Sequence, residues 1–243
     1  MIIKDFYDKL DECFASNDAA GAASVLEDYY KKAKAMDDTS LICAVLSERM
    51  GFYRGMGKEE EALSSVRLME ELIEKEELDK HIDGTNYATM LINMGTTKSR
   101  FGLYEEGLVL YDEAMKLLQG SEDYYLLASL SNNMSSAYEG IGESEKAIDS
   151  YKAAISFLDH PGILSYYKAI TYANMAACYE AMGDEKGQLS SVQMMDEIVD
   201  RLFELVDPGF ASCLNKCAMY HEHLGHVERA EYLRKRAEEI YSM

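Results

Sequence analysis

Proline is scarce in this chain of 243 residues, which contains only Pro161 and Pro208. Long runs of β-branched residues are missing as well. Proline breaks the interior of helices, and β-branched residues favour strands, so their scarcity leaves long helices uninterrupted and argues against a sheet. The hydrophobic share of 48% is ample for a packed core. We therefore expect an all-α protein.

Basic residues are few relative to acidic ones. The chain has 24 Lys and Arg against 44 Asp and Glu, which gives a formal net charge of −20. Nucleic acids and anionic membrane surfaces are bound by clustered Lys and Arg, so we expect neither as a partner. A basic partner stays open, although such acidity can also serve only to keep a protein in solution.

Signals for export, membrane insertion and disulfide bonding are also missing. The chain becomes charged at Lys4, before the apolar segment of a signal peptide can form. No apolar run approaches the roughly 18 residues of a membrane span. The cysteines form an odd set without a CxxC pair, which is typical of free thiols in a reducing compartment, and we expect a cytoplasmic protein. They are Cys13, Cys43, Cys178, Cys213 and Cys217.

Known catalytic motifs are absent from the sequence. It has no Walker loop, no dinucleotide-binding glycine pattern, no HExxH and no GxSxG. We expect neither an enzyme nor a cofactor. A weak zinc candidate is Cys213, Cys217 and His221, which the i, i+4, i+8 spacing places on one helical face. The alternative, which we favour, is that they are packed core residues and that no metal is bound.

A repeat of glycines organises what is present. Five glycines recur at intervals of 40 to 45 residues, each between two segments with helical periodicity. Such a period indicates stacked helix pairs, in which the glycine supplies the left-handed residue that ends the first helix. Asn17 takes this place in a degenerate first copy, because asparagine tolerates the same conformation. The glycines are Gly57, Gly102, Gly142, Gly183 and Gly225.

The repeat predicts one right-handed α-solenoid superhelix of about six antiparallel helix pairs. We expect a single domain over 1–243, with a degenerate first repeat at 1–37 and further repeats at 38–83, 84–121, 122–160, 161–207 and 208–243. Helix caps are expected at 37–40 and 81–85, and Pro208 is expected at the first position of a helix. The predicted helices are 2–15 with 18–35, 38–55 with 58–76, 85–101 with 104–119, 123–140 with 143–158, 163–182 with 184–206, and 208–224 with 226–242.

Aligned on the glycines, the repeats resemble the tetratricopeptide repeat (TPR). The clearest copy is NNMSSAYEGIGESEKAIDSYKAAI at 132–155. The resemblance implies that small residues let the helices approach closely and that a tyrosine fills the gap between pairs. The period of about 42 residues, instead of the usual ~34, resembles the kinesin-light-chain type and the repeats of bacterial regulators. The matching positions are Met134, Ser135 and Tyr138, followed by Ala147, Tyr151 and Ala154.

Some positions depart from the TPR pattern. Lys98 replaces the first-helix tyrosine of the third repeat, Gly107 replaces a second-helix alanine, and Arg234 replaces an aromatic residue. We expect these positions to loosen the local packing or to pair with neighbouring acids.

Asparagines mark the candidate binding surface. Asn93, Asn133 and Asn174 each lie nine residues before a repeat glycine, so they share one register on the first helices. The TPR resemblance implies that this register lines a concave groove, where a carboxamide can both donate to and accept from a peptide backbone. The alternative is that the asparagines bond across adjacent helices. The other candidate groove residues are Asn132, Ser129, Thr96, Ser136 and Arg100.

Two functions follow for such a groove. The first is a non-enzymatic protein–protein interaction module that binds a peptide or a partner segment. The alternative is the peptide-sensing domain of a bacterial signalling or transcription-regulator system whose output domain lies outside this chain. Apolar residues in the last predicted helix favour a homodimer through the terminal helices, if they are exposed. They are Tyr232, Leu233, Ile240 and Tyr241.

Overall fold

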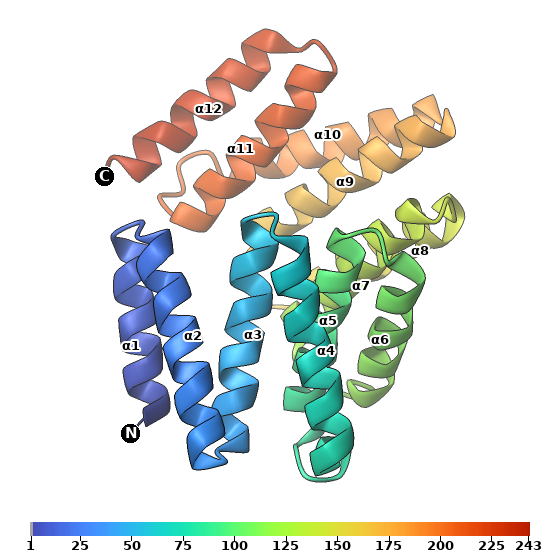
Figure 1. Ribbon diagram of the computed structural model, residues 1–243. Coiled ribbons are helices and arrows are strands. Elements are labelled where there is room, and N and C mark those ends of the chain that lie inside the picture. Colours follow the sequence, from blue (N-terminus) through green and yellow to red (C-terminus); the bar gives the residue numbers. More distant parts are fainter. Residues whose placement is uncertain (1) are drawn as a thin grey trace. The chain divides into compact units, whose positions relative to one another are not determined.

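A computed structural model describes residues 2–243. Over this range the chain forms twelve α-helices, one short 3₁₀ turn and no strand, so the all-α prediction is confirmed. None of the helices in this range is long and apolar enough to cross a membrane. The elements are α1 (Ile2–Ala15), α2 (Ala19–Met36), α3 (Thr39–Gly55), α4 (Glu59–Glu76), η1 (Leu78–Lys80), α5 (Gly84–Arg100), α6 (Tyr104–Leu117), α7 (Tyr124–Gly140), α8 (Ser144–Leu158), α9 (Tyr166–Met182), α10 (Glu185–Arg201), α11 (Pro208–His223) and α12 (Val227–Tyr241) (Figure 1).

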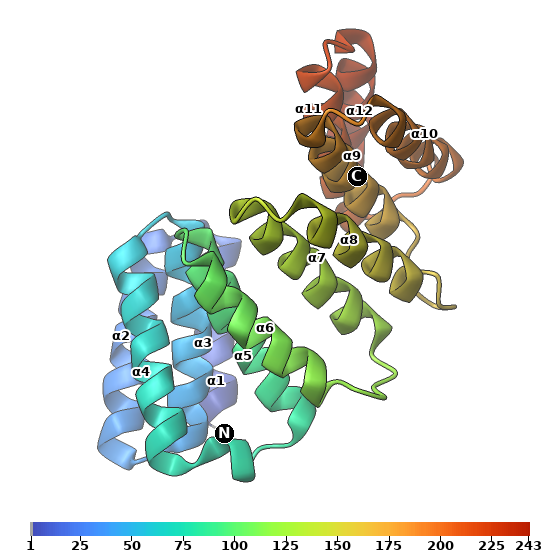
Figure 2. The same ribbon diagram turned by 90° about the vertical axis from the view of Figure 1, so that its right-hand side faces the viewer.

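The predicted left-handed turns are present. All five repeat glycines have a positive φ, between 67° and 83°. Asn17 has the same conformation, with a φ of 54°. At the first glycine turn, the Lys58 N–H donates to the carbonyl of Tyr53 at 2.9 Å, which satisfies a carbonyl of the ending helix. Consecutive helices therefore run antiparallel in pairs, as Figure 2 shows for α7 and α8.

The predicted caps are also present. The Asp38 carboxylate accepts from the N–H of Leu41 at 3.0 Å at the start of α3. The Asp83 carboxylate accepts from the first N–H groups of α5. Asp207 caps α11, whose first residue is Pro208. These side chains accept hydrogen bonds from N–H groups that have no partner inside the helix. They therefore fix the first residue of α3, α5 and α11.

Two predicted helix bounds are wrong. The helix expected over 184–206 ends at Arg201, because the chain turns there and packs Leu202, Phe203 and Leu205 against a hydrophobic core. The helix expected from 163 begins at Tyr166, after a turn. The turn η1 was not expected either. It follows α4 because Glu77 adopts the left-handed conformation, with a φ of 48°, and ends that helix.

The chain divides into two compact units, residues 2–119 with α1 to α6 and residues 120–243 with α7 to α12. The division falls close to the repeat boundary expected between 121 and 122. In the first unit, α1, α2, α3 and α4 lie side by side in sequence order (Figure 1). In the second unit, α9 contacts α8, α10 and α11. The single-domain organisation stays a prediction.

Two tyrosines at the second-helix position of the repeat fill the space between helices. Tyr111 and Tyr151 are each 1% exposed, although they are among the largest side chains in the chain. Each hydroxyl has a polar partner: that of Tyr111 donates to the Thr96 hydroxyl at 3.2 Å, and that of Tyr151 to the Glu139 carboxylate at 3.3 Å. Burial therefore adds apolar contact without leaving the hydroxyl unpaired.

Gly107 was expected to loosen the packing, and this expectation is wrong. It allows α6 to approach α5 at Gly95. A Cβ placed on Gly107 would lie 3.0 Å from the Gly95 carbonyl oxygen and 2.2 Å from Oγ of Ser99. Lys98 does pair with acids, as expected, because its ammonium lies 2.9 Å from Glu70 and 2.6 Å from Glu106. The departures from the pattern are thus compensated by close helix contact or by charge.

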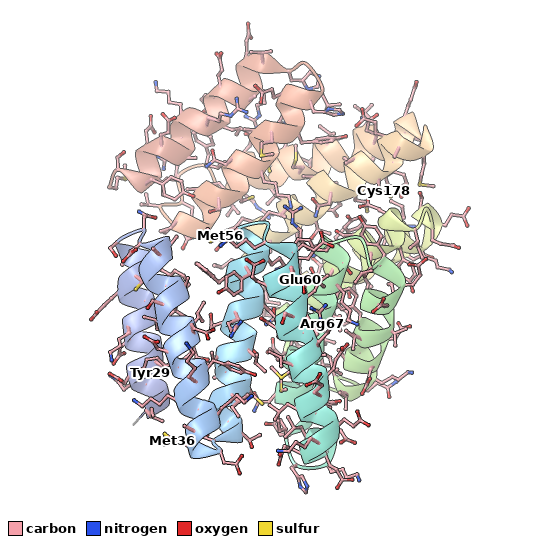
Figure 3. The ribbon with its side chains drawn as sticks, in the orientation of Figure 1. Tyr29, Met36, Met56, Glu60, Arg67 and Cys178 are labelled. Atoms are coloured by element: carbon pink, nitrogen blue, oxygen red, sulfur yellow. The ribbon has the colours of Figure 1, made fainter. Side chains whose placement is uncertain are left out.

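An acidic segment spans residues 59–79. It covers α4 and η1, and Glu60 has 82% of its side chain exposed. Its carboxylate pairs with Arg67 on the same helix at 2.7 Å (Figure 3). Such exposed pairs contribute at most about 1 kcal/mol each, so this run adds charge to the surface and little to stability.

The last helix closes the second unit with a polar face. Leu233 and Ile240, which were expected among exposed apolar residues, are buried in the core of that unit. Tyr232 is half exposed and stacks on Phe203, with ring centroids 4.7 Å apart. Because Leu233 and Ile240 are buried, two of the four apolar residues that suggested a dimer cannot contact a second copy of the chain. Most of the outward residues of α12 are charged. The charged outward residues include Glu228, Glu231, Lys235, Glu238 and Glu239.

Candidate functional site

Two of the three register asparagines line one groove in the second unit, which we call the unit-2 groove. Asn133 comes from α7 and Asn174 from α9, and both are half-buried. The groove has a volume of about 240 Å³. It brings together five of the eight predicted groove residues, because positions three or four apart share a helix face. Its lining residues are Tyr125, Ala128, Ser129, Asn132, Asn133, Ser136, Leu158, Tyr167, Ile170, Asn174 and Lys216.

Asn132 adds an unmatched acceptor to the wall of the unit-2 groove. Its amide nitrogen donates to the carbonyl of Ala128 at 3.2 Å and to the hydroxyl of Thr171 at 3.1 Å. Its amide oxygen is buried and has no hydrogen-bond partner. A buried acceptor without a donor costs about 1–3 kcal/mol, so a donor that reached this oxygen would be favoured.

Asn93 is used differently from the other two. Its amide nitrogen donates to the Ser47 carbonyl at 3.0 Å, and its amide oxygen accepts from Arg54 at 2.9 Å. Both partners lie on α3, so Asn93 joins α5 to α3. This matches the alternative of a bond across adjacent helices.

Replacing Asn93 with alanine is therefore expected to destabilise the protein by about 2 kcal/mol. The change removes the bond to a charged guanidinium and leaves the Ser47 carbonyl without its donor. Urea denaturation followed by circular dichroism measures the loss, and Asn86→Ala, at an exposed position on the same helix, is the control. An unchanged free energy of unfolding in Asn93→Ala would show that its amide has no structural role.

Asn93 also borders a larger hollow, which we call the unit-1 groove. It has a volume of about 1000 Å³ and lies between α1, α3, α5 and η1. The lining mixes hydroxyls and amides with two charged groups on α3. Its lining residues are Ile3, Tyr7, Thr39, Ser40, Cys43, Ala44, Ser47, Glu48, Gly51, Arg54, Leu78, His81, Ile82, Asn86, Thr89, Met90 and Asn93.

Thr96 and Arg100 lie outside both grooves. The Thr96 hydroxyl donates to the Ile92 carbonyl at 2.7 Å and accepts from Tyr111, so it belongs to the packing between α5 and α6. Arg100 is exposed at the end of α5. Neither side chain joins the other predicted residues.

The comparisons with known proteins agree with the helical-repeat fold. The tetratricopeptide repeat family model matches residues 86–159. These residues therefore carry the sequence pattern of the tetratricopeptide repeat. No curated protein matches its sequence.

Solved structures show the same fold for the TPR-like chain. BtubC (BKLC) from P. vanneervenii has 18% identity and a TM-score of 0.62, over 93% of this chain and 91% of that one. The apo form of RapI has 11% identity and a TM-score of 0.67, over 98% of this chain and 63% of that one. The apo quorum sensor NprR from B. thuringiensis has 13% identity and a TM-score of 0.62, over 97% and 64%.

The zinc candidate of the TPR-like chain is part of the core. The sulfur atoms of Cys213 and Cys217 lie 3.9 Å apart, and both residues are buried. His221 turns its Nε2 atom to the Asp196 carboxylate at 3.0 Å and its Nδ1 atom to His226 at 3.3 Å. Within residues 2–243, no group of three or more His, Cys, Asp or Glu side chains is arranged to hold a metal ion.

Cysteine chemistry is not favoured in the unit-1 groove. Cys43 lines it, and burial raises the pKa of its thiol to about 11. The thiol therefore stays protonated near neutral pH, whereas a nucleophilic cysteine needs a lowered pKa.

Sequence reasoning missed Glu48 and Arg54, although both had a signal. Glu48 lies nine residues before Gly57, so it occupies the asparagine register in the second repeat. Arg54 lies three residues before Gly57. It is basic, whereas the equivalent position carries an acid in three other repeats. Comparing charge at equivalent positions would have found both. The three acids are Glu139, Glu180 and Glu222.

Proposed function

We propose that this TPR-like chain is a non-enzymatic interaction module that binds a peptide or partner segment in the unit-2 groove. The observation that carries the proposal is the convergence of the Asn133 and Asn174 side chains, from two different helices, on one groove. A carboxamide donates and accepts at once, so two of them suit the alternating N–H and C=O groups of an extended backbone.

The remaining walls suit such a ligand. Ser129 and Ser136 add hydroxyls along α7, while Tyr125, Tyr167 and Ile170 add apolar surface. A groove with apolar walls and a few placed polar groups is typical of ligand sites. Lys216 also lines the groove, and no acid in residues 2–243 forms an ion pair with it.

The expected result of a capture experiment follows. Immobilised wild-type protein retains a partner from a lysate, and the double variant Asn133→Ala, Asn174→Ala loses at least about nine-tenths of it, since two backbone-directed bonds are removed. The matched control is Gln193→Ala, which removes an exposed amide on α10. Quantitative mass spectrometry reads the retained proteins, and circular dichroism checks that all three proteins are folded. Equal retention by the folded double variant would contradict the proposal.

A second candidate is a peptide-sensing domain. The similar structure of NprR is described as a quorum sensor, and the present chain covers 64% of it. The size of the unit-1 groove favours this candidate, because a hollow of about 1000 Å³ has room for a whole small ligand.

A further inference from the structure

The unit-1 groove contains two charged side chains that nothing in the protein neutralises. Glu48 and Arg54 both lie on α3 and both line the groove. Within residues 2–243, neither forms an ion pair, either with the other or with a third residue. The neighbouring Arg49, by contrast, pairs with Glu27 at 3.3 Å. Unpaired charges in a partly buried position raise the free energy of the folded protein, and a bound group of opposite charge would offset that cost.

The guanidinium of Arg54 is held in place by neutral groups. One nitrogen donates to the amide oxygen of Asn93 at 2.9 Å and to the hydroxyl of Thr97 at 2.7 Å. Burial lowers the pKa of Arg54, but a guanidinium keeps its charge at any physiological pH. The rest of its planar fork is left without a carboxylate in a chain whose net charge is −20. A fork of this kind recognises carboxylates through two parallel hydrogen bonds.

Glu48 presents the opposite case. Burial and the negative charge of Asp11 both raise the pKa of its carboxyl group. The ionised form is thus disfavoured in the free protein, and a cation that entered the groove would relieve both effects. Tyr7 and Ile3 of α1 also line the groove and supply apolar surface.

The groove surface also carries groups that suit a peptide backbone. Ser40, Asn86 and Thr89 line it and come from α3 and α5. The volume of about 1000 Å³ is at the upper end of the range for ligand pockets, about 300–1,000 Å³. A short peptide can lie wholly within such a hollow, and it then brings both terminal charges with it.

We propose that the unit-1 groove binds a short free peptide, with its amino terminus at Glu48 and its carboxylate at Arg54. The two unpaired charges have the signs that complement the two termini. Pairing both would remove the cost that each carries in the free protein. The proposal rests on the second candidate function and names its ligand class. It concerns different residues from the unit-2 groove, so either proposal can fail without the other.

Synthetic pools of random tripeptides test the proposal with the full chain, because Glu48 and Arg54 lie about 9 Å apart along α3, which is the span of about three extended residues. One pool has free termini, one is N-acetylated, one is C-amidated and one carries both caps. The protein is incubated with each pool, and the retained peptides are measured by affinity-selection mass spectrometry. We expect retention from the free pool and a loss of about tenfold or more for each cap, because each cap removes a charge-assisted bond.

Variants assign each terminus to its residue. Glu48→Gln is expected to abolish the effect of N-acetylation and to leave the effect of C-amidation unchanged. Arg54→Gln is expected to do the reverse, and Arg54→Lys to restore part of the preference for a free carboxylate. The controls are Glu105→Gln and Lys116→Gln, which change exposed residues on α6 and leave all preferences as in the wild type. Thermal melts followed by circular dichroism check that each variant is folded.

Three outcomes would overturn the proposal. Retention of capped and free peptides in equal amounts would show that the termini are not recognised. Enrichment of Lys together with Asp or Glu in the doubly capped pool would assign the two charges to side chains of a longer segment. Retention of no peptide above the level of the bare support would show that the groove does not bind short peptides.

Discussion

Replacing Gly95 with valine is expected to destabilise the first unit by about 3 kcal/mol or more. A Cβ at this position would lie 2.7 Å from the ring of Tyr111 and 3.1 Å from the carbonyl oxygen of Gly107. The tyrosine is 1% exposed and the carbonyl belongs to the backbone of α6, so neither can move aside without disturbing the pair of helices. Overpacking of this kind costs about 1–3 kcal/mol when the site can relax, and more when it cannot.

The measurement is urea denaturation of the valine variant, followed by circular dichroism. Gly55→Ala is the matched control, since Gly55 also lies in a helix and a Cβ there would have no neighbour within 4 Å. Alanine at Gly55 should stabilise the protein, by about 0.5–1 kcal/mol, because glycine is a poor helix former. A Gly95→Val protein as stable as the wild type would show that α5 and α6 can separate freely.

Replacing Tyr151 with alanine is expected to cost about 3–5 kcal/mol, the range measured for large aromatic residues in protein cores. The side chain is 1% exposed and belongs to the core cluster with Ala147, Ile148, Met175 and Cys178, so its removal leaves a cavity between α7, α8 and α9. Burial raises the pKa of its hydroxyl, which stays protonated and donates to Glu139 at 3.3 Å.

Tyr151→Phe distinguishes the contribution of the ring to stability from that of the hydroxyl. It keeps the packing and removes one hydrogen bond, so the expected loss is about 1 kcal/mol. Tyr241→Ala, at a side chain that is 54% exposed, should change stability by less than about 1 kcal/mol. Thermal and urea denaturation give all three values. Equal losses for Tyr151→Phe and Tyr151→Ala would contradict the interpretation that the ring fills the space between the repeats.

The helix pairs could be predicted from the sequence because their signals are local. A glycine with a positive φ, an aspartate before a helix and a proline at its first position each act within one turn. The repeat period then placed Asn133 and Asn174 in one register, and both line the unit-2 groove. The predicted end of α10 was wrong, because the packing of Leu202 and Phe203 against the core ends this helix and the repeat pattern does not contain that packing.

The role of each groove residue depends on its distance from side chains of neighbouring helices, which the repeat period of the sequence does not give. Asn93 shares its register with Asn133 and Asn174, yet its amide bonds to Ser47 and Arg54 because α3 lies close enough. Glu48 has the same register and was missed, because the pattern was followed as a residue type rather than as a position. The burial of Leu233 depends on how α12 packs in the second unit, which the sequence of one helix does not determine.

The turns of this chain preserve a left-handed backbone conformation, and glycine is not the only residue that provides it. At the five repeat glycines an added Cβ would meet nothing within 4 Å, so the absence of a side chain is not needed for space. Asn17 has the same conformation without being a glycine, and Asp37 and Glu77 adopt it at the ends of α2 and α4. The amino-acid sequence of such a turn can thus differ from repeat to repeat while the path of the backbone stays the same. A comparison of torsion angles would recognise such copies where a comparison of residues finds only 86–159.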